Sequence, residues 1–322
     1  MSVLVLSEHD VRELLDMESC VAAMEDVLAR LARDELINPL RVVMRSPGPA
    51  LGLGLMPAYA GGAAPVFSLK EIVVAPSNSE RGLDPHQGSV LLHDGITGQL
   101  TAILNASPIT EVRTAAVSAV ATKLLARPGS RTVAVLGSGV QGRSHVEAMQ
   151  TVLGDPLIRI WSRNPAHAEA LALETHSLVA ATIEEALDGA DIVCTTTAAR
   201  EPILQLGWLT PGTHVNAAGA SVRGARELDA ETIAAASLYV DRRESVVNES
   251  DEYSYAVEEA GIGPEHMLAE LGELLIGAHP GRQGDTELTV FKSHGIAAED
   301  LAAAELCVAR ARERGVGTEV EF

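Results

Sequence analysis

The sequence is poor in aromatic residues and in positive charge. Its 322 residues include only 2 Trp, 4 Tyr and 3 Phe, which leaves few side chains on which single-stranded bases could stack. It has 24 Lys plus Arg against 44 Asp plus Glu, and the resulting net charge of −20 repels nucleic-acid phosphates and anionic lipid. We therefore expect neither nucleic acid nor a membrane as a partner.

Cysteine is also scarce. Cys20, Cys194 and Cys307 are widely spaced and form no C-x-x-C pair, so we expect neither a disulfide framework nor a metal site. The first residues lack the basic segment and long apolar run of a signal peptide, and proline and glycine interrupt both long uncharged stretches, which disfavours membrane helices. These features favour a soluble protein of the reducing cytoplasm.

The length predicts two domains, at about 150 residues per domain. Residues 7–33 have helical periodicity, and residues 41–104 show short apolar runs broken by turn residues, which predicts an antiparallel or mixed sheet. A helix over residues 109–125 then ends at a Pro-Gly pair. Residues 128–296 alternate short strands with helices, which predicts a parallel sheet covered on both faces.

The expected fold is therefore α/β, with a Rossmann-type parallel-sheet domain at residues 128–296. A second, α+β domain comprises residues 1–127. A final helical segment lies beyond the parallel sheet, so we expect residues from about 297 to 322 to complete this second domain.

A glycine motif follows the apolar strand at residues 132–136 and opens a helix. It consists of Gly137, Ser138, Gly139, Val140, Gln141 and Gly142. The first glycine permits a tight turn, the second lets the backbone approach a pyrophosphate, and the third allows close packing of helix and strand. Free amides at the start of the helix then face the phosphates. The motif predicts a bound dinucleotide.

The next strand ends without the acidic residue that binds the ribose hydroxyls of NAD. Ser162 and Arg163 stand there instead, and a hydroxyl followed by a guanidinium suits a 2′-phosphate. We therefore expect NADP as the cofactor, with NAD as the alternative. Arg163 could instead be an ordinary solvated cation.

Polar and small residues mark the carboxyl ends of later strands, where open parallel sheets bind ligands. Thr195, Thr196, Asn216, Ala217 and Gly219 are the candidates for contact with the nicotinamide half of the cofactor. Cys194 precedes them and is expected to be packed inside a strand, because no base stands near it in the sequence.

Three cations lie in or beside apolar segments of the first domain: Arg41, Lys70 and Arg113. Because a cation on an apolar element is costly unless paired, each needs a partner. Glu71, Glu111 or a helix carbonyl could be structural partners, and a substrate carboxylate could be a functional one. Lysine occurs only at positions 70, 123 and 292, which favours a functional role for Lys70.

Several short motifs, in order along nearly the whole chain, together resemble the ornithine cyclodeaminase and mu-crystallin family. They are Arg41, Met56-Pro57, Lys70, His86-Gln87-Gly88, Asn105-Ala106, Arg113-Thr114-Ala115-Ala116, the glycine motif, Phe291-Lys292-Ser293, Gly295 and Glu299-Asp300-Leu301. The resemblance implies a homodimer whose first domain makes the dimer contact and the substrate site. It also implies that Arg41, Lys70 and Arg113 hold the α-carboxylate of the substrate.

Two positions depart from the cyclodeaminase pattern. Ser221 stands where the resemblance implies a catalytic aspartate, and Gly54 replaces a glutamate. Because a hydroxyl cannot replace a carboxylate as a base at neutral pH, cyclisation of ornithine is disfavoured. Ser221 and His294 are kept as further candidates for substrate contact.

The sequence looks more like the family members that reduce a cyclic ketimine, and the resemblance thus implies an NAD(P)H-dependent reductase of a small cyclic ketimine or α-imino acid. Lys70 would clamp the carboxylate with Arg41 and Arg113, or donate a proton to nitrogen. An ornithine cyclodeaminase and an alanine-type amino acid dehydrogenase are the alternatives among enzymes. A non-catalytic protein that binds NADPH and a carboxylate ligand is the alternative of another class.

Overall fold

The computed structural model describes residues 2–47, 52–75, 78, 81–84, 86–221 and 224–321. Its contacts divide the chain into two compact units, Met1–Arg113 with Ile296–Phe322, and Thr114–Gly295. The sequence places the boundary after residue 127, beyond the helix that it predicts from residue 109. The structure divides that helix, α3 (Ala106–Leu125), between the two units.

The first unit contains a sheet with the strand order β16-β1-β7-β6-β5-β4-β2, and β3 also pairs with β4. Its neighbouring strands are antiparallel except for β1 and β7. The strands are β1 (Ser2–Leu6), β2 (Leu36–Ile37), β3 (Val42–Arg45), β4 (Gly52–Ala60), β5 (Val66–Val74), β6 (His86–Asp94), β7 (Leu100–Asn105) and β16 (Thr318–Glu321). The predicted turn between β6 and β7 is present.

The predicted helix over residues 7–33 is two helices, α1 (Glu8–Leu14) and α2 (Met17–Ala32). Ser7 caps α1 and Asp16 caps α2, where its carboxylate accepts from the amide of Ser19 at 2.9 Å. An N-cap residue has non-helical backbone angles, so Asp16 interrupts an otherwise continuous periodicity.

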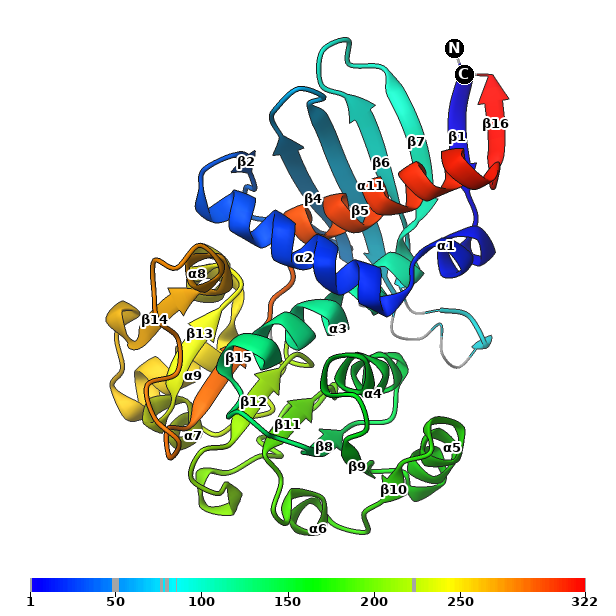
Figure 1. Cartoon of the computed structure of the whole chain (residues 1–322). Helices are drawn as coiled ribbons and strands as arrows, with labels where there is room; N and C mark the ends of the chain where they lie inside the picture. Colours follow the sequence, from blue (N-terminus) through cyan, green and yellow to red (C-terminus); the bar gives the residue numbers. More distant parts are fainter. Residues whose placement is uncertain are drawn as a thin grey trace. The chain divides into compact units, whose positions relative to one another are not determined.

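The C-terminal helix α11 (Ala297–Arg314) packs on the first unit's sheet. It crosses β4, β5 and β6 and lies alongside α2, which Figure 1 shows on the same face of the sheet. Alternation along β5 turns Ser68, Lys70 and Ile72 to this buried face. The helix thereby brings residues near position 300 against β4, β5 and β6 of this sheet.

The second unit contains an eight-stranded sheet that is parallel throughout, in the order β10-β9-β8-β11-β12-β15-β13-β14 (Figure 1). Its strands are β8 (Thr132–Leu136), β9 (Leu157–Trp161), β10 (Leu178–Val179), β11 (Ile192–Thr195), β12 (His214–Ala217), β13 (Ser237–Val240), β14 (Met267–Glu270) and β15 (Thr289–Lys292). Its helices, besides part of α3, are α4 (Val140–Leu153), α5 (Pro165–Thr175), α6 (Ile183–Leu187), α7 (Ala230–Ala235), α8 (Arg243–Glu249), α9 (Asp251–Ala260) and α10 (Leu271–Leu275).

The strand order places β8 between β9 and β11. The strands after β8 are therefore added first on one side of it, as β9 and β10, and then on the other side, starting with β11. This is the switch point at which doubly wound sheets bind nucleotides, outside the carboxyl ends of the strands. The last strand, β15, lies between β12 and β13 and thus joins the centre of the sheet. The predicted α/β class with a Rossmann-type sheet and a second α+β unit is confirmed.

Within the described ranges, no helix combines the length and apolar character needed to cross a membrane.

Candidate functional site

The glycine turn has the geometry that a dinucleotide requires. Gly137 has φ +127°, and a Cβ there would lie 2.4 Å from Thr196 Oγ1, so only glycine fits. A Cβ on Gly142 would lie 2.3 Å from the Gly137 carbonyl oxygen, which shows how closely α4 approaches β8. A Cβ on Gly139 would meet no atom within 4 Å. The middle glycine therefore faces open space, where a pyrophosphate could approach the backbone.

Gly139 is also the N-cap of α4, where it offers no side-chain oxygen to the first amides of the helix. The helix continues through Val140, which is exposed, and Gln141, whose carbonyl oxygen lies 2.7 Å from His145 Nδ1. An uncapped helix start attracts anions because its amides and dipole are both positive. The turn therefore fits a diphosphate group.

Ser162 and Arg163 follow β9 directly beside this turn. The Ser138 hydroxyl donates to Ser162 Oγ at 2.8 Å, which joins the glycine turn to the end of β9. Arg163 is exposed at the same end of the sheet. This is where a Rossmann fold receives the ribose that carries or lacks the 2′-phosphate.

The candidates after β11 and β12 are largely buried. Thr196 packs against Gly137 and donates to the Leu136 carbonyl at 3.1 Å. Asn216 and Ala217 are 0% exposed, and the Asn216 amide contacts Thr122 Oγ1 at 2.9 Å and His214 Nε2 at 3.2 Å. The side chain of Asn216 thus serves an internal polar network, and its contact with a cofactor stays a prediction.

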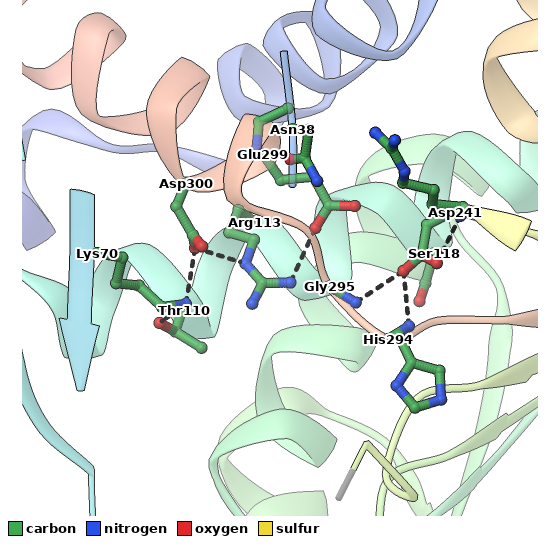
Figure 2. Close-up of polar contacts among 12 residues, drawn as sticks. Asn38, Lys70, Thr110, Arg113, Ser118, Asp241, His294, Gly295, Glu299 and Asp300 are labelled. Atoms are coloured by element: carbon green, nitrogen blue, oxygen red, sulfur yellow. Dashed lines mark hydrogen bonds and ion pairs between the residues drawn. The ribbon is translucent and has the colours of Figure 1, made fainter. Parts of the chain in front are cut away.

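In the first unit, Lys70 and Arg113 converge on one carboxylate, as Figure 2 shows. Asp300 Oδ1 accepts from Lys70 Nζ at 2.9 Å and from Arg113 Nε at 2.9 Å. Arg113 Nη1 also bonds Glu299 Oε2 at 2.9 Å, and Lys70 contacts Thr110 Oγ1 at 3.2 Å. Lys70 and Arg113 are only 2% and 5% exposed.

These partners differ from those that the sequence suggests. Glu71 points to the opposite face of β5 and accepts from Ser89, because successive side chains of a strand alternate. Glu111 pairs instead with Arg12 at 2.9 Å. Of the possible structural partners that the sequence offers, Glu71 and Glu111 thus contact Ser89 and Arg12, and the acids that bind Lys70 and Arg113 are Asp300 and Glu299.

The buried position of Lys70 changes its acidity. Desolvation lowers its pKa to about 8; the charge of Asp300 opposes this shift, and the charges of Arg113 and Arg41 add to it. Burial acts to raise the pKa of Asp300, but the charges and hydrogen bonds of Lys70 and Arg113 hold it below its ordinary value. The ammonium and the carboxylate are thus both charged at neutral pH.

Three cations act on this cluster. Lys70 and Arg113 belong to it, and Arg41, half-buried before β3, lies close enough for its charge to influence the pKa of Lys70. The carboxylates of the cluster are Glu299 and Asp300. Asp300 Oδ2 has no hydrogen-bond partner within the described residues. An anionic ligand with a hydrogen-bond donor would complement both features.

The other candidates lie after strands of the second unit. The backbone amide of Ser221 donates to the Gly219 carbonyl at 3.0 Å. His294 is 3% exposed, and its amide, like that of Gly295, donates to Asp241 Oδ2 (Figure 2). Their predicted roles in substrate contact stay predictions. In the described part, no cluster of His, Cys, Asp and Glu is arranged to hold a metal ion.

Two pairs of buried acidic residues are not among the site residues that the sequence predicts. Glu299 and Asp300 enter the prediction only as part of a family motif, although two adjacent acids at the start of an Ala-rich helix are a visible signal. Glu227 and Glu252 carry no such signal, yet both are at most 1% exposed. Lys292, which pairs with Glu252, is one of only three lysines in the sequence, and this rarity is a signal.

The profile of the ornithine cyclodeaminase/mu-crystallin family matches residues 1–315. The chain belongs to this family. Its sequence is 39% identical to ketimine reductase mu-crystallin of Mus musculus over 307 residues, which cover 94% of this chain and 95% of the mouse protein.

Two solved structures match the fold over 99% or more of the chain. Delta(1)-pyrroline-2-carboxylate reductase of Thermococcus litoralis, in complex with NADH and L-proline, gives a TM-score of 0.94 at 34% identity and covers 99% of this chain and 100% of that chain. An archaeal alanine dehydrogenase dimer with bound NAD gives a TM-score of 0.94 at 29% identity, with 100% of both chains covered.

Proposed function

We propose that this protein is an NAD(P)H-dependent reductase of a small cyclic ketimine or α-imino acid. The observation that carries the proposal is the buried convergence of Lys70 and Arg113 on Asp300, with the charge of Arg41 acting on Lys70. A substrate carboxylate would accept hydrogen bonds from the guanidinium and ammonium groups. The names of the mouse and Thermococcus relatives support reduction of a C=N bond.

The second unit would hold the cofactor. The Gly137–Gly142 turn and the start of α4 would receive the pyrophosphate, and Ser162 with Arg163 the adenosine ribose. When bound, the reduced nicotinamide supplies a hydride to the imine carbon. For this transfer the carbon must lie about 3–3.5 Å from the nicotinamide ring, so the carboxylate clamp would act by orienting one face of the imine.

Lys70 would supply the proton. Reduction of an imine adds a hydride to carbon and a proton to nitrogen, and an ammonium with a pKa of about 8 is mostly protonated at neutral pH while remaining a usable acid. Asp300 would hold Lys70 in place through its 2.9 Å hydrogen bond. Its second oxygen, Oδ2, would accept from the nitrogen of the product amine.

The cyclodeaminase alternative lacks the carboxylate that its chemistry needs, because Ser221 stands at that position. The dehydrogenase alternative uses the same clamp but an open-chain imine formed from a keto acid and ammonia. Two assays separate these functions. Oxidation of NADPH or NADH is measured with cyclic ketimines alone and with pyruvate plus ammonia, and release of ammonia is measured with ornithine plus NAD, because cyclodeamination causes no net redox change. Oxidation with a cyclic ketimine supports the proposal. Neither cofactor oxidation nor release of ammonia from ornithine, together with tight NADPH binding, would indicate a non-catalytic binding protein.

We propose NADPH as the preferred cofactor, because the end of β9 offers Ser162 and the exposed Arg163 and no carboxylate. The substitution Arg163→Asp is expected to shift the ratio of kcat/KM values from NADPH towards NADH by about 10-fold or more, since a charge-assisted bond is lost and repulsion is gained. The exposed Arg312→Asp is the matched control. An unchanged ratio in Arg163→Asp would place the 2′-phosphate elsewhere or make NAD the cofactor.

We also propose a homodimer formed through the edge of the first unit's sheet. Val42 and Met44 on β3, which pairs only with β4 among the described strands, are 59% and 64% exposed. Exposed apolar edge strands favour association with another chain. The wild-type chain is expected to elute as a dimer at micromolar concentration, and Met44→Asp to shift it towards monomer, as measured by light scattering. A monomeric wild-type protein would contradict the proposal.

A further inference from the structure

A buried carboxylate joins the loops that follow two central strands of the second unit. Glu227 is 0% exposed and accepts five hydrogen bonds. Three come from the β11 side: the hydroxyl of Thr195 at 2.8 Å and the amide and hydroxyl of Thr197 at 2.5 and 2.7 Å. Two come from the β12 side, from the amides of Gly219 at 2.9 Å and Ala220 at 3.2 Å.

All five partners are donors, so the geometry suits an ionised carboxylate, which accepts only. Burial and the nearby charge of Glu252 raise the pKa of Glu227, while Lys292 and the bonds from Thr197 oppose that shift. The five donors compensate for the loss of solvent around the charge.

The two loops lie so close together that no side chain larger than that of glycine fits at position 219. A Cβ on Gly219 would lie 2.3 Å from the carbonyl oxygen of Thr197 and 2.5 Å from Glu227 Oε1. The amides of Ala218 and Gly219 also donate to the Thr195 carbonyl at 3.0 Å. Glu227 therefore fixes the spacing of the two loops where they leave the sheet.

A second layer supports Glu227. Glu252 is 1% exposed and accepts from the backbone amides of Glu227 and Leu228 at 2.7 Å each. Lys292, at the end of β15, pairs with Glu252 at 2.8 Å and donates to the Ala220 carbonyl at 2.9 Å. Lys292 thus binds the carbonyl of Ala220, and Glu227 binds its amide. The loops after β11 and β12 and the end of β15 are joined through these contacts.

We propose that Glu227 is a positioning residue for the nicotinamide half of the cofactor, with Glu252 and Lys292 as its support. The inference rests on the proposed function, because it takes the carboxyl ends of β11 and β12 as the nicotinamide site. Glu227 does not touch the cofactor. It holds the Thr195–Thr197 and Gly219–Ala220 backbone in the conformation against which the ring binds, so its loss disturbs the nicotinamide half and spares the adenine half at the ends of β8 and β9.

The substitution Glu227→Gln tests whether the loss of Glu227 affects binding of the nicotinamide half and not of the adenine half. The glutamine NH₂ would face N–H and O–H donors and could not accept from them. We expect the affinity for NADPH and kcat for imine reduction each to fall about 10-fold or more. The affinity for 2′-phospho-ADP-ribose, which lacks the nicotinamide ring, should stay within about 2-fold, because its contacts lie at the glycine turn. Fluorescence titration and calorimetry measure the two affinities, with NADH and ADP-ribose run in parallel.

Asp191→Asn is the matched control. Asp191 also accepts from two backbone amides, those of Arg131 and Thr132, and pairs with Arg127, but it precedes β11 at the amino end of the sheet. It should destabilise the unit without changing the ratio of the two affinities. Thr197→Val removes one donor to Glu227 and provides a milder variant, expected to show the same selective loss at about 3-fold.

The outcomes separate the inference from the proposed function. The positioning role is overturned if Glu227→Gln and Thr197→Val lose both affinities equally, or lose neither. The proposed function still stands in that case, provided that the wild-type protein binds NADPH and reduces ketimines. Wild-type protein that binds none of the four nucleotides overturns the proposed function itself. A selective loss of nicotinamide-dependent affinity supports both.

Discussion

Replacement of Lys70 by methionine is expected to lower kcat for ketimine reduction by about 10²- to 10⁴-fold, the usual contribution of a general acid. Methionine keeps much of the volume of the lysine stem, and Asp300 retains its bond to Arg113 at 2.9 Å, so the variant should fold. NADPH affinity should persist, because the glycine turn belongs to the other unit. Steady-state kinetics with a fluorescence titration of NADPH measure both quantities.

The exposed Lys123→Met on α3 is the matched control, since it removes the same charge away from the cluster. The wild-type pH profile adds an independent check. Reduction needs protonated Lys70, so kcat/KM should be highest below the pKa of about 8 and fall as the pH rises through that value. Full activity of Lys70→Met would remove Lys70 from the mechanism.

The second large effect is expected for Asp300→Asn. This change leaves Lys70 and Arg113 buried with one carboxylate fewer, and breaking a buried ion pair lowers the free energy of unfolding by about 3–5 kcal/mol. Because Asp300 raises the pKa of Lys70, its loss should lower that pKa. The alkaline fall in kcat/KM should therefore move to lower pH.

Glu305→Gln provides the comparison on the same helix, because Glu305 is half-buried on α11 and makes no contact with Lys70 in the described structure. Denaturant unfolding and pH-rate profiles of both variants give the two readouts. An Asp300→Asn profile that coincides with the wild-type profile would show that Asp300 does not control the acid.

Much of the fold follows from local sequence patterns. The glycine turn, the alternation of β5 and the cap at Ser7 are recognisable because each depends on residues within a few positions of one another. The break at Asp16 was missed because the apolar periodicity continues across it. The resemblance to the family, confirmed by the match over residues 1–315, identified the Glu299-Asp300 motif but not its contacts.

The partners of Lys70 and Arg113 could not be derived from the sequence in this way. Asp300 lies 230 positions from Lys70 and 187 from Arg113, and only the packing of α11 on β5 brings them together. Glu227 is a similar case, since it joins loops whose spacing is set by the order of the strands. Local reasoning singled out the buried cations Lys70 and Arg113 and missed the anions that pair with them.

The most direct measurement of the central claim compares kcat/KM for Δ1-pyrroline-2-carboxylate with kcat/KM for Δ1-pyrroline, the same ring without the carboxylate. Two charge-assisted hydrogen bonds to the carboxylate predict a preference of about 10²- to 10⁴-fold in the wild-type protein. Arg113→Met should remove most of that preference. Equal kcat/KM values for the two imines in the wild-type protein would contradict the account.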